Sequence, residues 1–240
     1  MVFHLHLPKP IHGWKMFFNE IAVISIGIGI ALGGEQLLEN WREGHMAEKS
    51  LVAIREELAL NLGRMQARVA TEDCLTARLN QIGEFIDPPK GTTPKRPTWV
   101  GRPQVWNMQT SAVQAARSYG SLTNLPPDEQ MAISTTYASM ASFEEIEREE
   151  QWAWAVLRSI ADDRNLSDDD RSELRHALQR ARYAAWHLRV SALQAVDDAE
   201  PLDVKPRPVA NGSRSVCIPM DTPFAEAVKL SGTADIGEPR

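Results

Sequence analysis

The sequence predicts an all-α protein in which an N-terminal transmembrane helix continues into a long helix and is followed by an antiparallel bundle of about four helices. Three observations predict this class. One uninterrupted apolar run lies near the N-terminus, at residues 21–34. Beyond it, apolar residues recur every three or four positions, which is typical of amphipathic helices. No segment alternates apolar and polar residues as a half-buried strand does.

These patterns divide the chain into four parts: a cytoplasmic arm at residues 1–15, a transmembrane anchor at 16–38, a helical bundle domain at 39–200, and an irregular C-terminal segment at 201–240. With 43% hydrophobic and 24% charged residues, the 240-residue chain can bury a substantial core. Its net charge of −6 and the lack of a clustered basic stripe argue against nucleic acid as a partner.

The anchor contains a run without charged residues, residues 21–34, in which Ser25 is the only polar side chain. A membrane-spanning helix needs roughly 20 apolar residues, which is more than this run contains, and Phe17 and Phe18 add to its insertion free energy. Seven large aliphatic side chains contribute roughly −3.5 kcal/mol to insertion, at about −0.5 kcal/mol each. Glu20 opposes insertion, but near the end of the run it costs less than the roughly 3 kcal/mol of a charge at the bilayer centre. The balance favours insertion.

Two other interpretations of this run stay open, a cleavable signal peptide and a buried core helix. A short basic start and the small residues Ala31 and Gly33 fit a signal peptide. However, Leu37, Leu38 and Trp41 continue the helical period without the turn or proline that often marks a processing site. An uncleaved anchor is therefore the preferred interpretation.

The short N-terminal arm decides the expected orientation. The positive-inside rule counts Lys and Arg, and Lys9 and Lys15 before the run are matched by Arg42 and Lys49 after it. Because the arm is short, we expect the N-terminus in the cytoplasm and residues 35–240 in the periplasm. The chain is thus expected to be a single-pass protein of the bacterial inner membrane.

The first part of the body is expected to be one long helix, or two nearly in line, that runs from the membrane to Asp87. We expect a bend near Gly44, Gly63 or Thr71. Prolines and glycines make residues 88–104 a loop.

Further helices follow this loop. One is expected from about Pro103 to Ser118. The next begins at Pro127, because proline and the two acidic residues after it are favoured in a first helical turn, and it runs to about Ala161.

The last long helix begins at Ser167, whose hydroxyl can cap the amide of Asp170 while the Asp170 carboxylate reaches back. Pro201 ends this helix. A short helix is expected at residues 224–230.

Cys74 and Cys217 are too few and too far apart for a zinc site. An even number of cysteines in an oxidising compartment predicts one disulfide, which would tie the irregular C-terminal segment to the first long helix. The alternative is two buried free thiols in a cytoplasmic domain.

Two features of the anchor predict interactions within the membrane. Gly29 and Gly33 form a Gly-x-x-x-Gly step, which lets two helix backbones approach closely, although glycine is also common in membrane helices. Glu20 is expected to be protonated or paired, with Lys15 or a partner helix supplying the opposite charge. The expected partners are the membrane and either a second copy or another membrane protein; no small-molecule ligand can be named.

No motif predicts an enzyme, a metal or a cofactor. Glu173 and His176 give a single Glu-x-x-His step, whereas a ferritin-like di-iron site needs two and further carboxylates. The acidic run at residues 143–150 lacks the glycine and alternating oxygen donors of a calcium loop, so we interpret it as a solvated helix face. The histidines of the N-terminal arm are interpreted as residues at the membrane surface; they are His4, His6 and His12.

Two sets of residues carry a resemblance. They are Pro8, Pro10, His12-Gly13-Trp14, Phe18, Glu20, the Ile/Gly run, Ala31-Leu32-Gly33-Gly34-Glu35-Gln36 and Trp41, and then Trp106, Leu122, Leu125-Pro126 and Tyr137. The pattern resembles a group of uncharacterised single-pass bacterial membrane proteins of proteobacterial type. It covers about half of the chain and includes no catalytic motif. The resemblance implies an N-terminal anchor and a helical domain, without an activity.

Together these observations predict a membrane-anchored, non-catalytic helical scaffold or interaction protein. One alternative is a periplasmic ligand-sensing domain, which would act through a partner because the arm before the anchor is too short for an output domain. The other alternative is an exported helical enzyme, which would need a cleaved signal and a polar pocket.

Overall fold

The computed structural model describes residues 13–162, 165–209 and 214–232. These residues are largely helical and contain no strand, which confirms the predicted all-α class. The helices are α1 (Trp14–Val69), α2 (Glu72–Ile86), α3 (Ser111–Ser118), α4 (Pro127–Arg158), α5 (Asp168–Asp198) and α6 (Phe224–Ser231), with short 3-10 turns at Ser121–Asn124, Ser159–Ala161, Glu200–Leu202 and Ser215–Cys217.

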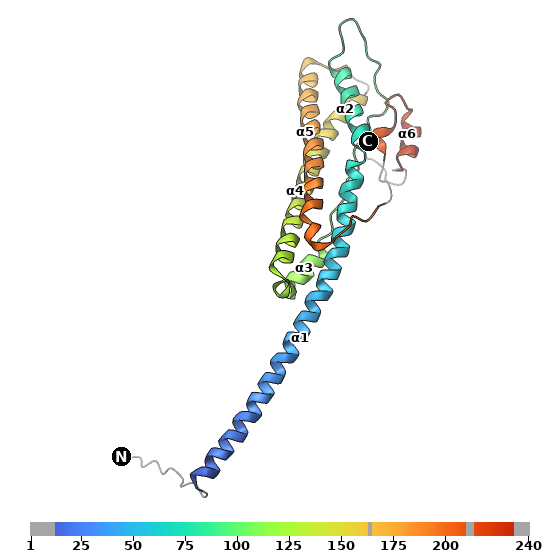
Figure 1. The fold of residues 1–240 in the computed structure, drawn as a ribbon. Helices are drawn as coiled ribbons and strands as arrows, with labels where there is room; N and C mark the ends of the chain where they lie inside the picture. Colours follow the sequence, from blue (N-terminus) through green and yellow to red (C-terminus); the bar gives the residue numbers. More distant parts are fainter. Residues whose placement is uncertain (1–12, 163–164, 210–213, 233–240) are drawn as a thin grey trace, which may run out of the picture.

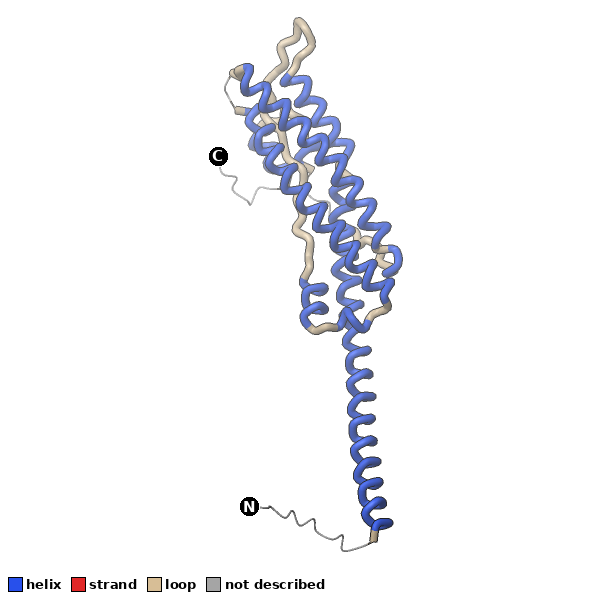
Figure 2. Tube along the Cα trace, turned by 90° about the vertical axis from the view of Figure 1, so that its left-hand side faces the viewer, coloured by secondary structure: helices blue, strands red, loops and turns tan. Residues whose placement is uncertain are grey.

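Helix α1 has two parts. Residues 14–46 are exposed along their whole length and extend from the body as a stalk (Figures 1 and 2). From Ala47 onward the same helix packs into the body. The stalk contains an 18-residue window of mean hydropathy 1.8, of which 0% is buried. It is therefore long and apolar enough to cross a membrane, and it is not a core helix of the body.

The break between α1 and α2 lies at Ala70 and Thr71, one of the three sites where a bend was predicted. The Thr71 hydroxyl donates a hydrogen bond to the Arg68 carbonyl at 2.8 Å, which satisfies an acceptor at the helix end. At Gly44 and Gly63 the helix continues without interruption. Figure 1 shows α2 extending the course of α1 toward the far end of the body.

The predicted helix from Pro103 is wrong for its first half, because residues 101–110 are extended and α3 begins only at Ser111. Side chains of other helices bind the backbone of this segment. The amide of Met108 donates to Glu144 at 2.7 Å, and the amide of Gln109 donates to Asn61 at 2.9 Å. Because these contacts satisfy its amides, the segment does not need helical hydrogen bonds.

Helices α4 and α5 form an antiparallel pair that packs along the length of the body (Figures 1 and 2). Both starts agree with the sequence: Pro127 is the first residue of α4, and Ser167 forms a capping box with Asp170. The core has two main clusters. The cluster near the stalk includes Ile54, Leu58, Leu62, Met65, Phe143 and Leu188, and the distal cluster includes Leu75, Ile82, Trp154, Leu157 and Leu178.

The segment after α5 crosses α1 at Gly63. The amide of Arg207 donates to the Ala59 carbonyl at 2.8 Å. A Cβ atom added at Gly63 would lie 1.8 Å from the carbonyl oxygen of Arg207. The missing side chain of Gly63 is therefore what allows the two backbones to touch.

Replacing Gly63 with valine is expected to destabilise the body by about 1–3 kcal/mol, because the crossing segment must move away and lose its hydrogen bond. Chemical denaturation of the purified protein measures this loss. Gly44→Ala is the matched control, since a Cβ atom there meets nothing within 4 Å. The control should be neutral or slightly stabilising; equal losses in both variants would contradict the importance of the crossing.

Candidate functional site

The predicted anchor residues all lie on the stalk. Glu20, Gly29 and Gly33 are exposed, and a Cβ atom added at either glycine meets nothing within 4 Å. The body does not cover this part of α1, so its apolar surface is free to contact lipid or another helix. Self-association through the two glycines and pairing of Glu20 stay predictions.

The structure brings Cys74 and Cys217 together and joins them in a disulfide, with their Cα atoms 4.9 Å apart. Cys74 lies in the first turns of α2, and Cys217 ends the 3-10 turn Ser215–Cys217. The bridge therefore attaches the C-terminal segment to α2, although the two cysteines lie 143 positions apart in the sequence.

Arg78 of α2 reinforces this attachment, a role that no pattern in the sequence indicated. Its guanidinium is buried and donates hydrogen bonds to backbone carbonyls of two loops, those of Val100 and Ile218. Burial lowers the pKa of Arg78 to about 10. Its side chain lies one helical turn beyond Cys74, so a covalent bond and a buried cation hold the same segment against the same face of α2.

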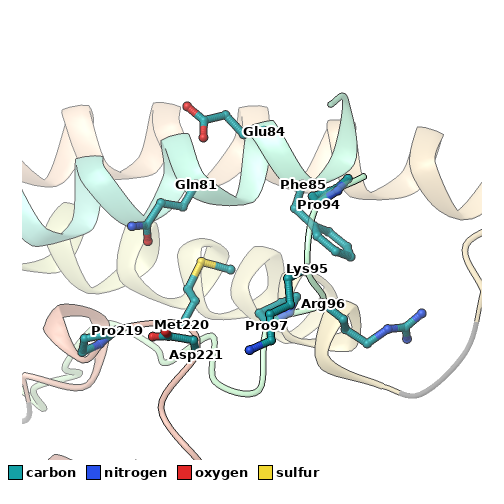
Figure 3. A pocket seen from close by; sticks show the side chains of 10 residues that line it. All are labelled: Gln81, Glu84, Phe85, Pro94, Lys95, Arg96, Pro97, Pro219, Met220 and Asp221. Carbon is teal, nitrogen blue, oxygen red and sulfur yellow. The ribbon is translucent and has the colours of Figure 1, made fainter. Parts of the chain in front are cut away.

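A pocket of about 330 Å³ lies between α2 and the two loops that Arg78 holds (Figure 3). Its apolar lining comes from Phe85, Pro94, Pro97, Pro219 and Met220, and its polar lining from Gln81, Glu84, Lys95, Arg96 and Asp221. The amides of Thr98 and Trp99 both donate to the Met220 carbonyl, at 2.8 and 3.0 Å. The volume is at the lower end of the range for small-molecule sites. The shape of the pocket depends on the attachment of the C-terminal segment, because that segment forms one wall.

Polar side chains of α1 bind the extended segment and the first turn of α3 from one side. Glu57 accepts hydrogen bonds from the Ser111 hydroxyl at 2.9 Å and from the Ala112 amide at 2.8 Å, and so caps α3. It also accepts a hydrogen bond from the Tyr137 hydroxyl at 2.5 Å. Burial is the main cause of a raised pKa at Tyr137, and the neighbouring Glu57 carboxylate raises this pKa further. One buried carboxylate thus links α1, α3 and α4.

Helix α4 binds the same segment from the other side, through the acidic run that was predicted to be a solvated face. That prediction is wrong for Glu147 and Glu150, which are buried, while Glu144 is partly buried. Glu147 accepts from the Trp106 amide at 3.3 Å. Glu150 accepts from Arg68 of α1 at 2.6 Å, and both side chains of this pair are nearly inaccessible to solvent.

The buried carboxylates of α4 have shifted proton affinities. Burial raises the pKa of Glu147 to about 7, against the opposing effects of the Trp106 amide and of Arg68. Burial also raises the pKa of Glu150, while Arg68 lowers it. Since the pKa of Glu147 in the folded state exceeds its usual 4.5, protonation of Glu147 favours folding. Its stabilising contribution is complete below about pH 4.5 and is lost as the pH rises through 7.

Wild-type protein is therefore expected to lose more stability between pH 5 and pH 8 than a Glu147→Gln variant, in which a neutral amide replaces the carboxylate. Chemical denaturation at both pH values measures the difference. Parallel pH profiles of the two proteins would contradict a raised pKa at Glu147.

The sequence matches no protein-family model and no curated protein, and no solved structure matches the fold. Within the described residues, no group of three or more His, Cys, Asp and Glu side chains is arranged to hold a metal ion. Glu173 and His176 line a surface hollow of about 420 Å³ between α4 and α5. The three histidines of the N-terminal arm lie outside the described residues.

Proposed function

We propose that the protein is a single-pass protein of the bacterial inner membrane whose helical body stands in the periplasm and acts as a non-catalytic interaction module. The observation that carries this proposal is the course of α1. One unbroken helix, Trp14–Val69, begins in an exposed apolar segment and ends in the core of the body. The resemblance to single-pass membrane proteins of proteobacterial type supports the same architecture.

The continuous helix fixes the height of the body above the membrane. If the anchor ends at Leu38, Ala47, the first residue of α1 that the body buries, lies nine positions further along the helix. At 1.5 Å per residue this is about 13 Å. The body would therefore stand close to the membrane surface in a fixed orientation, which suits a module that presents its surface to a membrane-bound partner.

One observation supports periplasmic placement of the body: the Cys74–Cys217 disulfide requires an oxidising compartment to persist. The proposal thus links the redox state of the cysteines to the orientation of the anchor.

Labelling of intact cells with a membrane-impermeant maleimide tests the placement. A Ser142→Cys variant puts a thiol on the exposed surface of α4, and we expect it to react before the cells are lysed. A His6→Cys variant in the N-terminal arm is the control and should react only after lysis. The opposite pattern would overturn periplasmic placement, and recovery of the protein in the soluble fraction would overturn the anchor.

The pocket beside Met220 favours a second candidate function, a ligand-sensing domain that acts through a partner. Its lining combines an apolar surface with charges of both signs, which suits a small zwitterion. Saturable binding of free phenylalanine that is lost in a Met220→Arg variant would support this candidate; equal heats of titration for both proteins would count against it.

A further inference from the structure

The outer surface of α5 carries a stripe of large apolar side chains that the described part of the chain leaves uncovered. Tyr183, Trp186, Val190 and Leu193 are 60%, 57%, 38% and 57% exposed, and Trp152 of neighbouring α4 is 75% exposed. We call these five residues the α5 face. The opposite side of α5 is buried and rich in alanine: Ala177, Ala181, Ala184, Ala192 and Ala195. A single exposed apolar residue is normal, but a contiguous stripe rich in Trp and Tyr is typical of an interface.

The aromatic rings of the α5 face hold one another in place. The ring of His187 stacks on those of Tyr183 and Trp186, with centroids 5.7 and 5.9 Å apart. A hollow of about 170 Å³ separates Trp152 from Tyr183. Rings that are already packed lose little conformational freedom when a partner binds, so the face is preorganised for association.

We propose that the α5 face binds the same face of a second copy of this chain, as a parallel two-fold dimer. The inference rests on the proposed function, because the anchor places both copies in one membrane with the same orientation. Helix α5 runs lengthwise along the body, as α1 does (Figure 1). A two-fold axis along the membrane normal therefore makes the two α5 helices parallel, so that each residue meets its own copy. The spacing of three, four and three residues in the stripe is that of a coiled-coil seam.

Charged residues flank the stripe on both sides in this arrangement. On the side facing α2, Arg182 donates to Asn80 and Arg189 pairs with Glu72. On the side facing α4, Glu145 and Glu149 are exposed, and Arg180 lines the same hollow as Glu149. A two-fold rotation about the α5 seam places the α4 side of one copy against the α2 side of the other, so Arg182 meets acidic residues of the second copy. Because both sides carry charges of both signs, the homodimer is favoured mainly by apolar contact.

The glycines of the anchor lie on the side of α1 that this dimer needs. Gly29 and Gly33 precede Ala47 and Leu51 by 18 residues each, which is five full helical turns. Ala47 and Leu51 are buried against the body, so the glycines face the same side as the body does. Figure 1 shows the stalk running toward the side on which α4 and α5 lie. An axis beside the α5 face therefore turns the two glycine surfaces toward each other.

Photocrosslinking of the full-length protein in intact cells tests the dimer. A benzoylphenylalanine in place of Val190 is expected to give a covalent homodimer. The matched control is the same group in place of Val52, an exposed valine of α1 on the side away from the body. Equal crosslinking at both positions would indicate random collision and overturn the proposal, and a product with a different protein would assign the face to another partner.

The same crosslinker in place of Leu193 distinguishes the two orientations. In a parallel pair it should attach to the tryptic peptide of residues 190–214 of the second copy, because prolines after Lys205 and Arg207 block cleavage there. An antiparallel pair centred on Trp186 would attach it to peptides that end at or before Arg189, and this result would overturn the proposed arrangement.

Charged substitutions test the energy of the contact. Trp186→Glu together with Leu193→Glu is expected to weaken dimerisation by at least about 30-fold, as loss of an interface hot spot does. Because both side chains are exposed, the fold of the body, and hence its far-UV circular dichroism spectrum, should not change. Unchanged dimerisation in a folded variant would contradict dimerisation through the α5 face and leave the proposed function intact. Loss of the protein from the membrane fraction would instead contradict the proposed function.

Discussion

Removing the disulfide by replacing Cys74 and Cys217 with alanine is expected to lower the free energy of unfolding by about 2–5 kcal/mol. The bridge closes a loop whose ends are 143 positions apart. The chain-entropy argument gives about 5 kcal/mol for such a loop, which is an upper figure because residual structure in the unfolded chain reduces it. This is comparable to the net stability of a whole domain.

Urea denaturation of the purified protein, with and without reductant, measures the effect. Reductant should destabilise the wild type and leave the double variant unchanged. Free, alkylatable thiols in wild-type protein taken from intact membranes would contradict both the bridge and the proposed periplasmic placement of the body.

The second large effect is expected at the ion pair between Arg68 and Glu150. An Arg68→Met substitution leaves the Glu150 carboxylate buried without a cation, and breaking a buried pair in this way costs about 3–5 kcal/mol. Replacing both residues with methionine should restore much of the stability, because no uncompensated charge then stays in the core. Urea denaturation of the single and double variants measures this pattern.

An exposed ion pair provides the matched control. Arg175 and Asp87 are also 2.6 Å apart, but both side chains are about half exposed. The Arg175 hydrogen bond lowers the pKa of Asp87, yet solvent screens this pair, so Arg175→Met should cost far less than Arg68→Met. Similar losses in the two variants would show that burial does not decide the energy of the Arg68 pair.

The long helices could be predicted from the sequence because their signals are local. Apolar spacing, the proline at position 127 and the Ser167 capping box each act within a few residues of the chain, and the structure agrees with all three. The extended segment at 101–110 could not be predicted in this way. Its backbone is bound by Asn61 and Glu144, which lie far from it in sequence.

The burial of Glu147 and Glu150 could have been predicted from their spacing, although the acidic composition of the run suggests an exposed face. Phe143, Glu147, Glu150 and Trp154 are spaced by four, three and four residues, so they share one side of the helix. Because two of the four are large apolar residues, this side was bound to face the core. The partner cation could not be found from sequence, since Arg68 lies 82 positions away.

The break between α1 and α2 divides the body mechanically. A helix resists bending and twisting, so a tilt or rotation of the stalk is transmitted directly to Leu58, Leu62 and Met65 in the adjacent core cluster. The break at Ala70 and Thr71 interrupts this lever before α2. The pocket beside α2 lies beyond this break, so a movement of the stalk can reach it only through α4 and α5, which join the two core clusters.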